Sequence, residues 1–139
     1  MNHLIKTALC GAAFLAMNLA HAADLTIMID DVKAADGNVL VAVYSSADTF
    51  LKKPLSSSGA PASMTGNKLV FKDLPEGEYA FAVYHDANAN GKMDKNLIGM
   101  PTEDYAFSNN AMGKMGPPNY ESAKFSVPAA GATVRVSLK

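Results

Sequence analysis

Two segments of this chain are apolar on both faces of a two-residue period, and they constrain the fold more than any other feature. These segments are Val39–Tyr44 and Tyr79–Tyr84. A strand that is apolar on both sides belongs in the middle of a sheet with both faces covered. The tetrapeptides Val41-Ala42-Val43-Tyr44 and Phe81-Ala82-Val83-Tyr84 echo each other. We therefore predict two neighbouring core strands.

Further short apolar segments alternate with turn signals along the rest of the chain. Strands are expected at residues 24–30, 68–72, 124–127 and 133–138. Residues 45–63 are less regular, with Phe50 and Leu51 expected to anchor a loop or helical turn on the core. No segment predicts a convincing helix. Short strands at this spacing favour an all-β fold, a single antiparallel Greek-key β-sandwich of about seven strands.

The first 22 residues have the pattern of a cleaved secretory signal peptide. A positive region ends at Lys6, an apolar run covers residues 8–20, and Ala20-His21-Ala22 fits the small-x-small cleavage rule. The apolar run is too short for a membrane span. Cleavage after Ala22 or Ala23 predicts a periplasmic or secreted domain, residues 23–139, of about 117 residues.

Charge and cysteine content exclude several classes of function. The chain has 12 basic residues, of which Lys6 leaves with the signal, and 13 acidic residues. This balance, spread along the chain, argues against a nucleic-acid or anionic-membrane partner. Cys10 lies within the signal, so the mature domain is expected to have neither a disulfide nor thiol chemistry. His85 remains as its single histidine.

A long segment, residues 86–122, contains little that predicts strand or helix. Glycine and proline recur through it, and the aromatic residues Tyr105, Phe107 and Tyr120 indicate that it packs against the domain. A loop of this length in a compact domain is expected to be functional or ordered by a ligand. We therefore predict a long ordered loop that carries the function.

The chain resembles the DUF2141 family of uncharacterised bacterial secreted proteins over nearly the whole mature domain. The segments that carry the resemblance are 37–44, 74–86, 88–94 and 107–118. The resemblance implies a sandwich related to transthyretin-like (prealbumin-like) and carboxypeptidase-regulatory-like domains. The resemblance implies no activity, and an activity cannot be inferred from the fold alone.

The start of the long loop has oxygen-bearing side chains at the spacing of a hard-cation site. With Asp86 at position 1 of an EF-hand loop, a glycine falls at position 6 and Leu97, which cannot coordinate, at position 12. A strand, not a helix, precedes this loop. The expected Ca²⁺ ligands are Asp86, Asn88, Asn90, the carbonyl of Lys92, and Asp94.

Glu103 or Asp104 could fold back to supply a further carboxylate. With few negative ligands, the dissociation constant would be about 10⁻⁴–10⁻³ M, in the range of extracellular modules. The alternative is a plain turn, because Asn-Gly and Asp-Gly sequences form tight turns and asparagine side chains cap their own backbone.

Three other functions use residues of the same region. An envelope enzyme would use His85, although its neighbour Asp86 points to the opposite face of a strand and no nucleophile elbow is present. A Cu(I) carrier would combine His85 with the loop methionines 93, 100, 112 and 115. A glycan, peptide or envelope-protein patch would comprise His85, Tyr105, Asn109, Asn110 and Tyr120. The alternative is that these residues have structural roles only. The asparagines would hydrogen bond to backbone groups of the loop, the tyrosines would pack in the core and the methionines would fill gaps under the loop.

Overall fold

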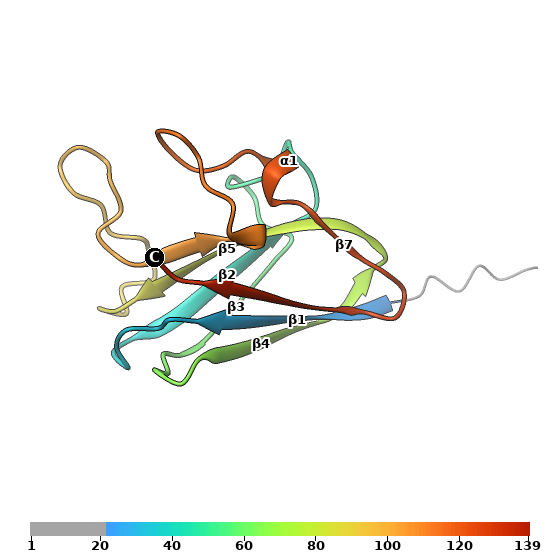
Figure 1. Ribbon diagram of the computed structural model, residues 1–139, viewed down its shortest axis with the longest axis horizontal. Helices are drawn as coiled ribbons and strands as arrows, with labels where there is room; N and C mark the ends of the chain where they lie inside the picture. The colour runs from blue at the N-terminus through green and yellow to red at the C-terminus, as the bar shows by residue number, and fades with distance from the viewer. Residues whose placement is uncertain (1–21) are drawn as a thin grey trace, which may run out of the picture.

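The computed structural model describes residues 22–139 as two β-sheets packed face to face (Figure 1). This confirms the predicted all-β sandwich. The predicted signal peptide, with Cys10, His3 and His21, lies outside the described residues apart from Ala22, so its removal stays a prediction. Within residues 22–139, no helix is long and apolar enough to cross a membrane.

The smaller sheet has three strands in the order β4 (Asn67–Pro75), β1 (Ala22–Asp30), β8 (Ala132–Ser137). In β1, the buried residues Leu25 and Ile29 alternate with partly or fully exposed neighbours, as the two-residue period predicts. β1 pairs antiparallel with β4 but parallel with β8. The expectation of a wholly antiparallel sandwich is therefore wrong at this one pair.

The larger sheet has the order β3 (Ser56–Pro61), β2 (Asn38–Tyr44), β5 (Gly77–Asp86), β6 (Tyr105–Phe107). β7 (Phe125–Val127) pairs with the start of β5. The two echoing segments are antiparallel neighbours, with Ala42 opposite Ala82. This register confirms the prediction of two adjacent core strands.

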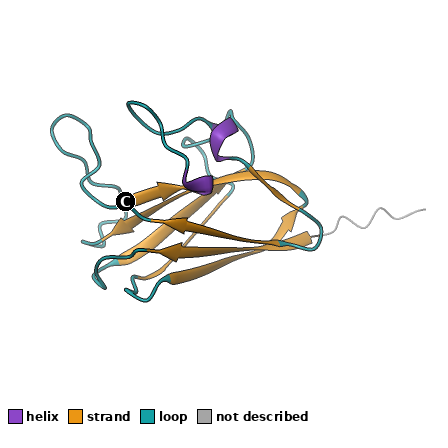
Figure 2. Cartoon of the chain, viewed as in Figure 1, coloured by secondary structure: helices purple, strands orange, loops and turns teal. Residues whose placement is uncertain are grey.

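Both faces of β2 and β5 are apolar because each face meets a different cluster. On the inner face, Val41 and Phe81 pack in the core between the sheets. On the outer face, Tyr44 meets Phe50 with ring centroids 5.4 Å apart, and Phe50 meets Tyr120 at 5.9 Å. The short helix α1 (Tyr120–Ala123) and the 3₁₀ turn η1 (Ser108–Asn110) lie over this face (Figure 2).

Three local expectations need correction. Residues 45–63 include strand β3, whose Ser-Ser-Ser-Gly-Ala-Pro sequence has no apolar alternation and which sits at a sheet edge. Leu51 is 38% exposed and has a positive φ of 60°, so only Phe50 anchors this segment. The segment 86–122 contains β6, η1 and part of α1 rather than one continuous loop.

Candidate functional site

The predicted cation ligands begin where β5 ends, so the sheet positions the first of them. Asp86 is the last residue of β5 and pairs with Asn38, the first residue of the neighbouring strand β2. Its side chain is buried, with the residue 1% exposed, in a chain whose other aspartates lie at or near the surface. A buried carboxylate must be compensated by donors or by a cation.

The chain closes a tight turn around the Asp86 carboxylate. The amide of Asn90 donates to Asp86 Oδ1 over 3.1 Å, and the amide of Gly91 donates to Oδ2 over 2.8 Å. The turn needs positive φ at Ala89 (54°) and at Gly91 (77°). Each carboxylate oxygen accepts one hydrogen bond and keeps lone pairs for another partner.

The two asparagines gather Asp94 into the same turn. Asn88 Nδ2 donates to Asp94 Oδ2 over 2.5 Å, and Asn90 Nδ2 donates to Asp94 Oδ1 over 2.7 Å. Their Oδ1 atoms accept the amides of Asn90 (3.3 Å) and Lys92 (3.1 Å), and each keeps a second lone pair. Three of the five predicted ligands, Asn88, Asn90 and Asp94, therefore meet through side chains, and the Asp86 carboxylate joins them through the Asn90 amide. Lys92 joins them through its backbone while its side chain is exposed.

Glu103 folds back onto this cluster, as one of the two expected additional ligands. Both of its carboxylate oxygens are buried. Neither accepts a hydrogen bond of good geometry, although the amide and carboxylate of Asp94 lie beside the group. Burial, and then the negative charges of Asp94 and Asp86, raise the pKa of Glu103 from 4.5 to about 7. Contact with Glu103 and the two asparagine amides lowers the pKa of Asp94.

Asp104, the other expected additional ligand, is directed elsewhere. Its carboxylate pairs with Lys33 Nζ at 3.1 Å. Sequence reasoning also missed Tyr84, whose pKa is raised by burial and then by Asp86, Glu103 and Asp94. The strand period that places Tyr84 on the outer face of β5 was the available signal.

The three carboxylates are coupled electrostatically but do not converge on one point. Within residues 22–139, no three His, Cys, Asp or Glu side chains are grouped closely enough to hold a metal ion by themselves. A cation here would therefore need asparagine and main-chain oxygens as well, which is the ligand mixture that Ca²⁺ accepts.

The raised pKa of Glu103 predicts a pH-dependent stability in metal-free buffer. The folded chain keeps the Glu103 proton up to about pH 7, whereas the unfolded chain releases it near 4.5. The folded state thus binds more protons in this window, and the free energy of unfolding should fall as pH rises through it. We expect the free energy of unfolding to fall by about 1–2 kcal/mol. This is less than the full pKa shift of Glu103 implies, because the residue is only partly buried and water screens its charge.

Urea titrations of the wild type and of Glu103→Gln between pH 4.5 and 8 measure this effect. The variant should lose the slope. Asp94 does not obscure the result, because its lowered pKa acts below its ordinary value of 3.8, where its stabilising contribution is lost as pH falls. Parallel slopes in the two proteins would show that Glu103 ionises normally.

His85 has a structural position beneath the loop. It is 5% exposed, its Nε2 lies 2.6 Å from the carbonyl oxygen of Asp36, and its amide donates to the carbonyl of Asp104. His85 therefore contacts the β1–β2 turn through its ring and the segment before β6 through its main-chain amide. With Nε2 engaged and the ring buried, His85 is poorly placed as an exposed general base.

The other residues of the expected binding patch are engaged in separate contacts. Asn109 Nδ2 donates to the carbonyls of Ser122 and Lys124, and the buried Tyr120 donates its hydroxyl to Glu78 O. Asn110 Oδ1 accepts the amide of Ser137 over 3.0 Å. These contacts match the alternative in which such residues satisfy loop backbone.

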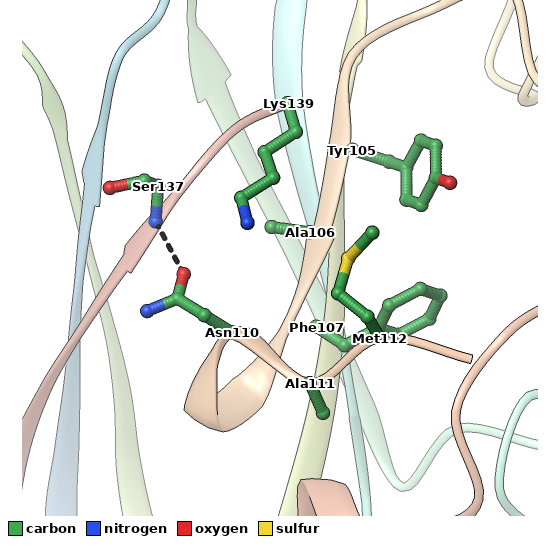
Figure 3. Close-up of a pocket in the computed structure, with 8 residues that line it drawn as sticks. All are labelled: Tyr105, Ala106, Phe107, Asn110, Ala111, Met112, Ser137 and Lys139. Atoms are coloured by element: carbon green, nitrogen blue, oxygen red, sulfur yellow. Dashed lines mark hydrogen bonds between the residues drawn. The ribbon is translucent and has the colours of Figure 1, made fainter. Parts of the chain in front are cut away.

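Tyr105 and Asn110 do line one small cavity with Met112 and Lys139 (Figure 3). Its volume is about 10 Å³, room for a single water at most. The predicted soft-metal ligands do not gather there either. Met100, Met112 and Met115 are exposed by 55–103%.

A shallow groove lies on the outer face of the larger sheet beside the candidate cation turn. Its volume is about 390 Å³. Leu40 and Ala82 contribute apolar surface, Tyr84 contributes its ring, and Gly91 of the turn lies at its edge. The turn and the groove therefore share one face of the molecule through Tyr84 and Gly91.

Comparison with known proteins identifies a family but no function. A family model described as an uncharacterised protein conserved in bacteria (DUF2141) matches residues 27–135. No curated protein and no solved structure matches the chain. The matched span includes the whole candidate cation turn.

Proposed function

Because the chain belongs to the DUF2141 family of uncharacterised bacterial proteins, which carries no assigned activity, we propose a function from the site alone. The protein is an exported β-sandwich that serves as a binding or structural module. Its 86–122 segment is stabilised by one weakly bound Ca²⁺. Asp86 and Asp94 supply charge, and the side-chain oxygens of Asn88 and Asn90 and the Lys92 carbonyl complete the shell.

One observation carries this proposal. The Glu103 carboxylate is buried against that of Asp94 without a good hydrogen bond, beside the turn built on Asp86. Two carboxylates in contact need a shared proton or a cation between them. Glu103 thereby adds a third negative charge beside the shell, which lacks the last acidic ligand of an EF-hand because the fully exposed Leu97 stands at that position.

The nature of the ligands favours Ca²⁺ over Mg²⁺. The turn offers carboxylate, amide and carbonyl oxygens on a loop, not a rigid octahedron. Ca²⁺ accepts six to eight such ligands at variable geometry, whereas Mg²⁺ demands near-ideal octahedral geometry and gives up its waters reluctantly. By neutralising Asp94 and Glu103, the ion would tie the base of residues 94–103 to the end of β5.

Thermal unfolding of metal-stripped protein tests the proposal. Calcium at about 2 mM should stabilise the protein by about 0.5–2 kcal/mol, a rise of several degrees in Tm, if the dissociation constant is about 10⁻⁴–10⁻³ M. The rise should follow RT ln(1 + [Ca²⁺]/Kd) and should be smaller with magnesium. Equal curves in calcium and in chelator would exclude the ion from the function.

Export is the second part of the proposal. The small-x-small pattern at Ala20-His21-Ala22 supports it, and burial of Ala23 (4% exposed) in the core favours cleavage before Ala23 over cleavage after it. The protein recovered from the envelope fraction should have the intact mass of residues 23–139. Ala20→Arg should leave the precursor uncleaved. A wild-type mass that retains residues 1–22 would contradict the proposal.

A further inference from the structure

Residues 94–102 form a small hairpin, which we call the finger. Its base is closed by the amide of Thr102 donating to Asp94 O over 2.9 Å, and its middle by Asn96 N donating to Met100 O over 2.8 Å. An isolated bridge joins residues 95 and 101. Paired backbone groups define the finger from base to tip, so the direction of its side chains is set by the fold.

The tip of the finger is also hydrogen bonded internally. Asn96 Oδ1 accepts the amides of Ile98 (3.1 Å) and Met100 (3.0 Å), and Gly99 N donates to Asn96 O at a positive φ of 81°. With its backbone satisfied, the tip presents side chains outward. Leu97 is 107% exposed and Ile98 83% exposed.

This exposure is exceptional within the described part of the chain. The three most exposed large apolar side chains among residues 22–139 are Leu97, Met115 and Ile98. Met115 lies in a second loop, residues 111–118, which also projects from the body of the sandwich (Figure 1). Such side chains in water indicate an interaction surface.

The exposed charged side chains nearest these tips are lysines, whereas the carboxylate of Asp94 lies at the base of the finger and accepts the side-chain amides of Asn88 and Asn90. Lys95 is exposed within the finger, Lys92 is exposed just before it, and Lys114 is exposed beside Met115. Residues 95–102 and 105–120 contain no aspartate or glutamate. Between them, the carboxylate oxygens of Glu103 are buried and Asp104 pairs with Lys33. The outer parts of the projecting loops, residues 95–102 and 111–118, are therefore basic, although the net charge of the whole chain is negative.

We propose that the finger docks the protein on an anionic membrane surface. Leu97 and Ile98 enter the boundary between headgroups and acyl chains, while Lys92 and Lys95 contact lipid phosphates. A convex tip with two adjacent apolar side chains needs no complementary pocket when it enters lipid, whereas a protein partner would have to provide one. The finger is complete without an ion, so this proposal stands independently of the calcium site.

Vesicle binding measured in chelator tests the proposal, because chelator removes calcium bridging and the proposed ion site together. The chain has no tryptophan, so Leu97→Trp introduces a unique indole at the tip. Vesicles of phosphatidylcholine alone are compared with vesicles that are about one-third phosphatidylglycerol. We expect a blue shift of the indole fluorescence with the anionic vesicles only, weakened by salt.

Co-sedimentation with the same vesicles then compares the wild-type protein with matched variants. The full chain is used as purified. Leu97→Ser with Ile98→Ser should weaken binding about tenfold, and Lys95→Ala about fivefold. The control is Met64→Ser, which removes an apolar side chain that is 65% exposed outside both loops and should bind as the wild type does. Wild-type protein that stays in the supernatant, or equal losses in the control, would overturn the proposal and leave a protein as the partner of the finger.

Discussion

Asp86→Ala is expected to abolish the calcium response and to destabilise the protein by about 2–4 kcal/mol even in chelator. The loss in chelator arises because the amides of Asn90 and Gly91 both donate to this buried carboxylate. Removing it leaves the Gly91 amide without its acceptor and the Asn90 amide with only the longer bond to Asn88 Oδ1, so the turn opens. In calcium the loss should be larger by the stabilisation that the ion supplies, about 0.5–2 kcal/mol.

The measurement is a pair of urea titrations, one in calcium and one in chelator, for each protein. Asp104→Ala is the matched control, because it removes a nearby carboxylate that pairs with Lys33 at the surface and not with the turn. The control should cost at most about 1 kcal/mol, and equally in both conditions. If Asp86→Ala also costs the same in calcium as in chelator, the turn is structural and binds no ion.

Gly37→Ala is expected to destabilise the protein by more than about 3 kcal/mol, because Gly37 lies against the start of the candidate loop. A Cβ added at Gly37 would sit 2.0 Å from the carbonyl oxygen of Asp86 and 2.7 Å from that of Ala87. Both atoms are backbone, and the residue also has a φ of +66°. The substitution must therefore displace the entry to the loop, and the calcium response should weaken with it.

Gly91→Ala provides the comparison that separates a steric clash from backbone strain. Gly91 also has a positive φ, +77°, but a Cβ there would meet nothing within 4 Å. Strain alone should cost about 1–2 kcal/mol. Urea denaturation of the two variants measures the difference. If the two substitutions lower the free energy of unfolding equally, the backbone can relieve the clash between the added Cβ at Gly37 and the Asp86 carbonyl oxygen without loss of stability.

A strand could be predicted from the sequence where the pattern of its own apolar residues indicates a strand. The two-faced apolar pattern of β2 and β5 placed them correctly as neighbours. Strand β3 carries no such signal, because a serine-rich edge strand owes its conformation to pairing with β2. The parallel pairing of β1 with β8 joins the two ends of the domain, and no local pattern encodes a choice of that kind.

The candidate site was predictable where its residues are close in sequence. The spacing of Asp86, Asn88, Asn90 and Asp94 predicted a turn that gathers their side chains, and the structure has that turn. The choice between Glu103 and Asp104 could not be made from sequence. It depends on the finger, which returns the chain to Asp94, and on Lys33 from another segment.

The roles of the expected patch residues depended on tertiary contacts in the same way. Asn109 and Asn110 are adjacent in sequence, yet Asn109 bonds to residues around α1 and Asn110 to β8. Their positive φ values, 62° and 49°, show why asparagine is suited to this turn. Neither the partners nor the turn could be inferred from a polar pair in a long segment.

Equilibrium dialysis of metal-stripped protein against calcium counts the ions bound per chain and so tests the proposed site itself. We expect one ion per chain with a dissociation constant of about 10⁻⁴–10⁻³ M, and the affinity should rise as pH rises through about 7, where Glu103 ionises. Binding should be lost in Asp86→Ala and retained in Asp104→Ala. If no calcium is bound at millimolar concentration, residues 86–94 form a hydrogen-bonded turn only, and the proposed function is wrong.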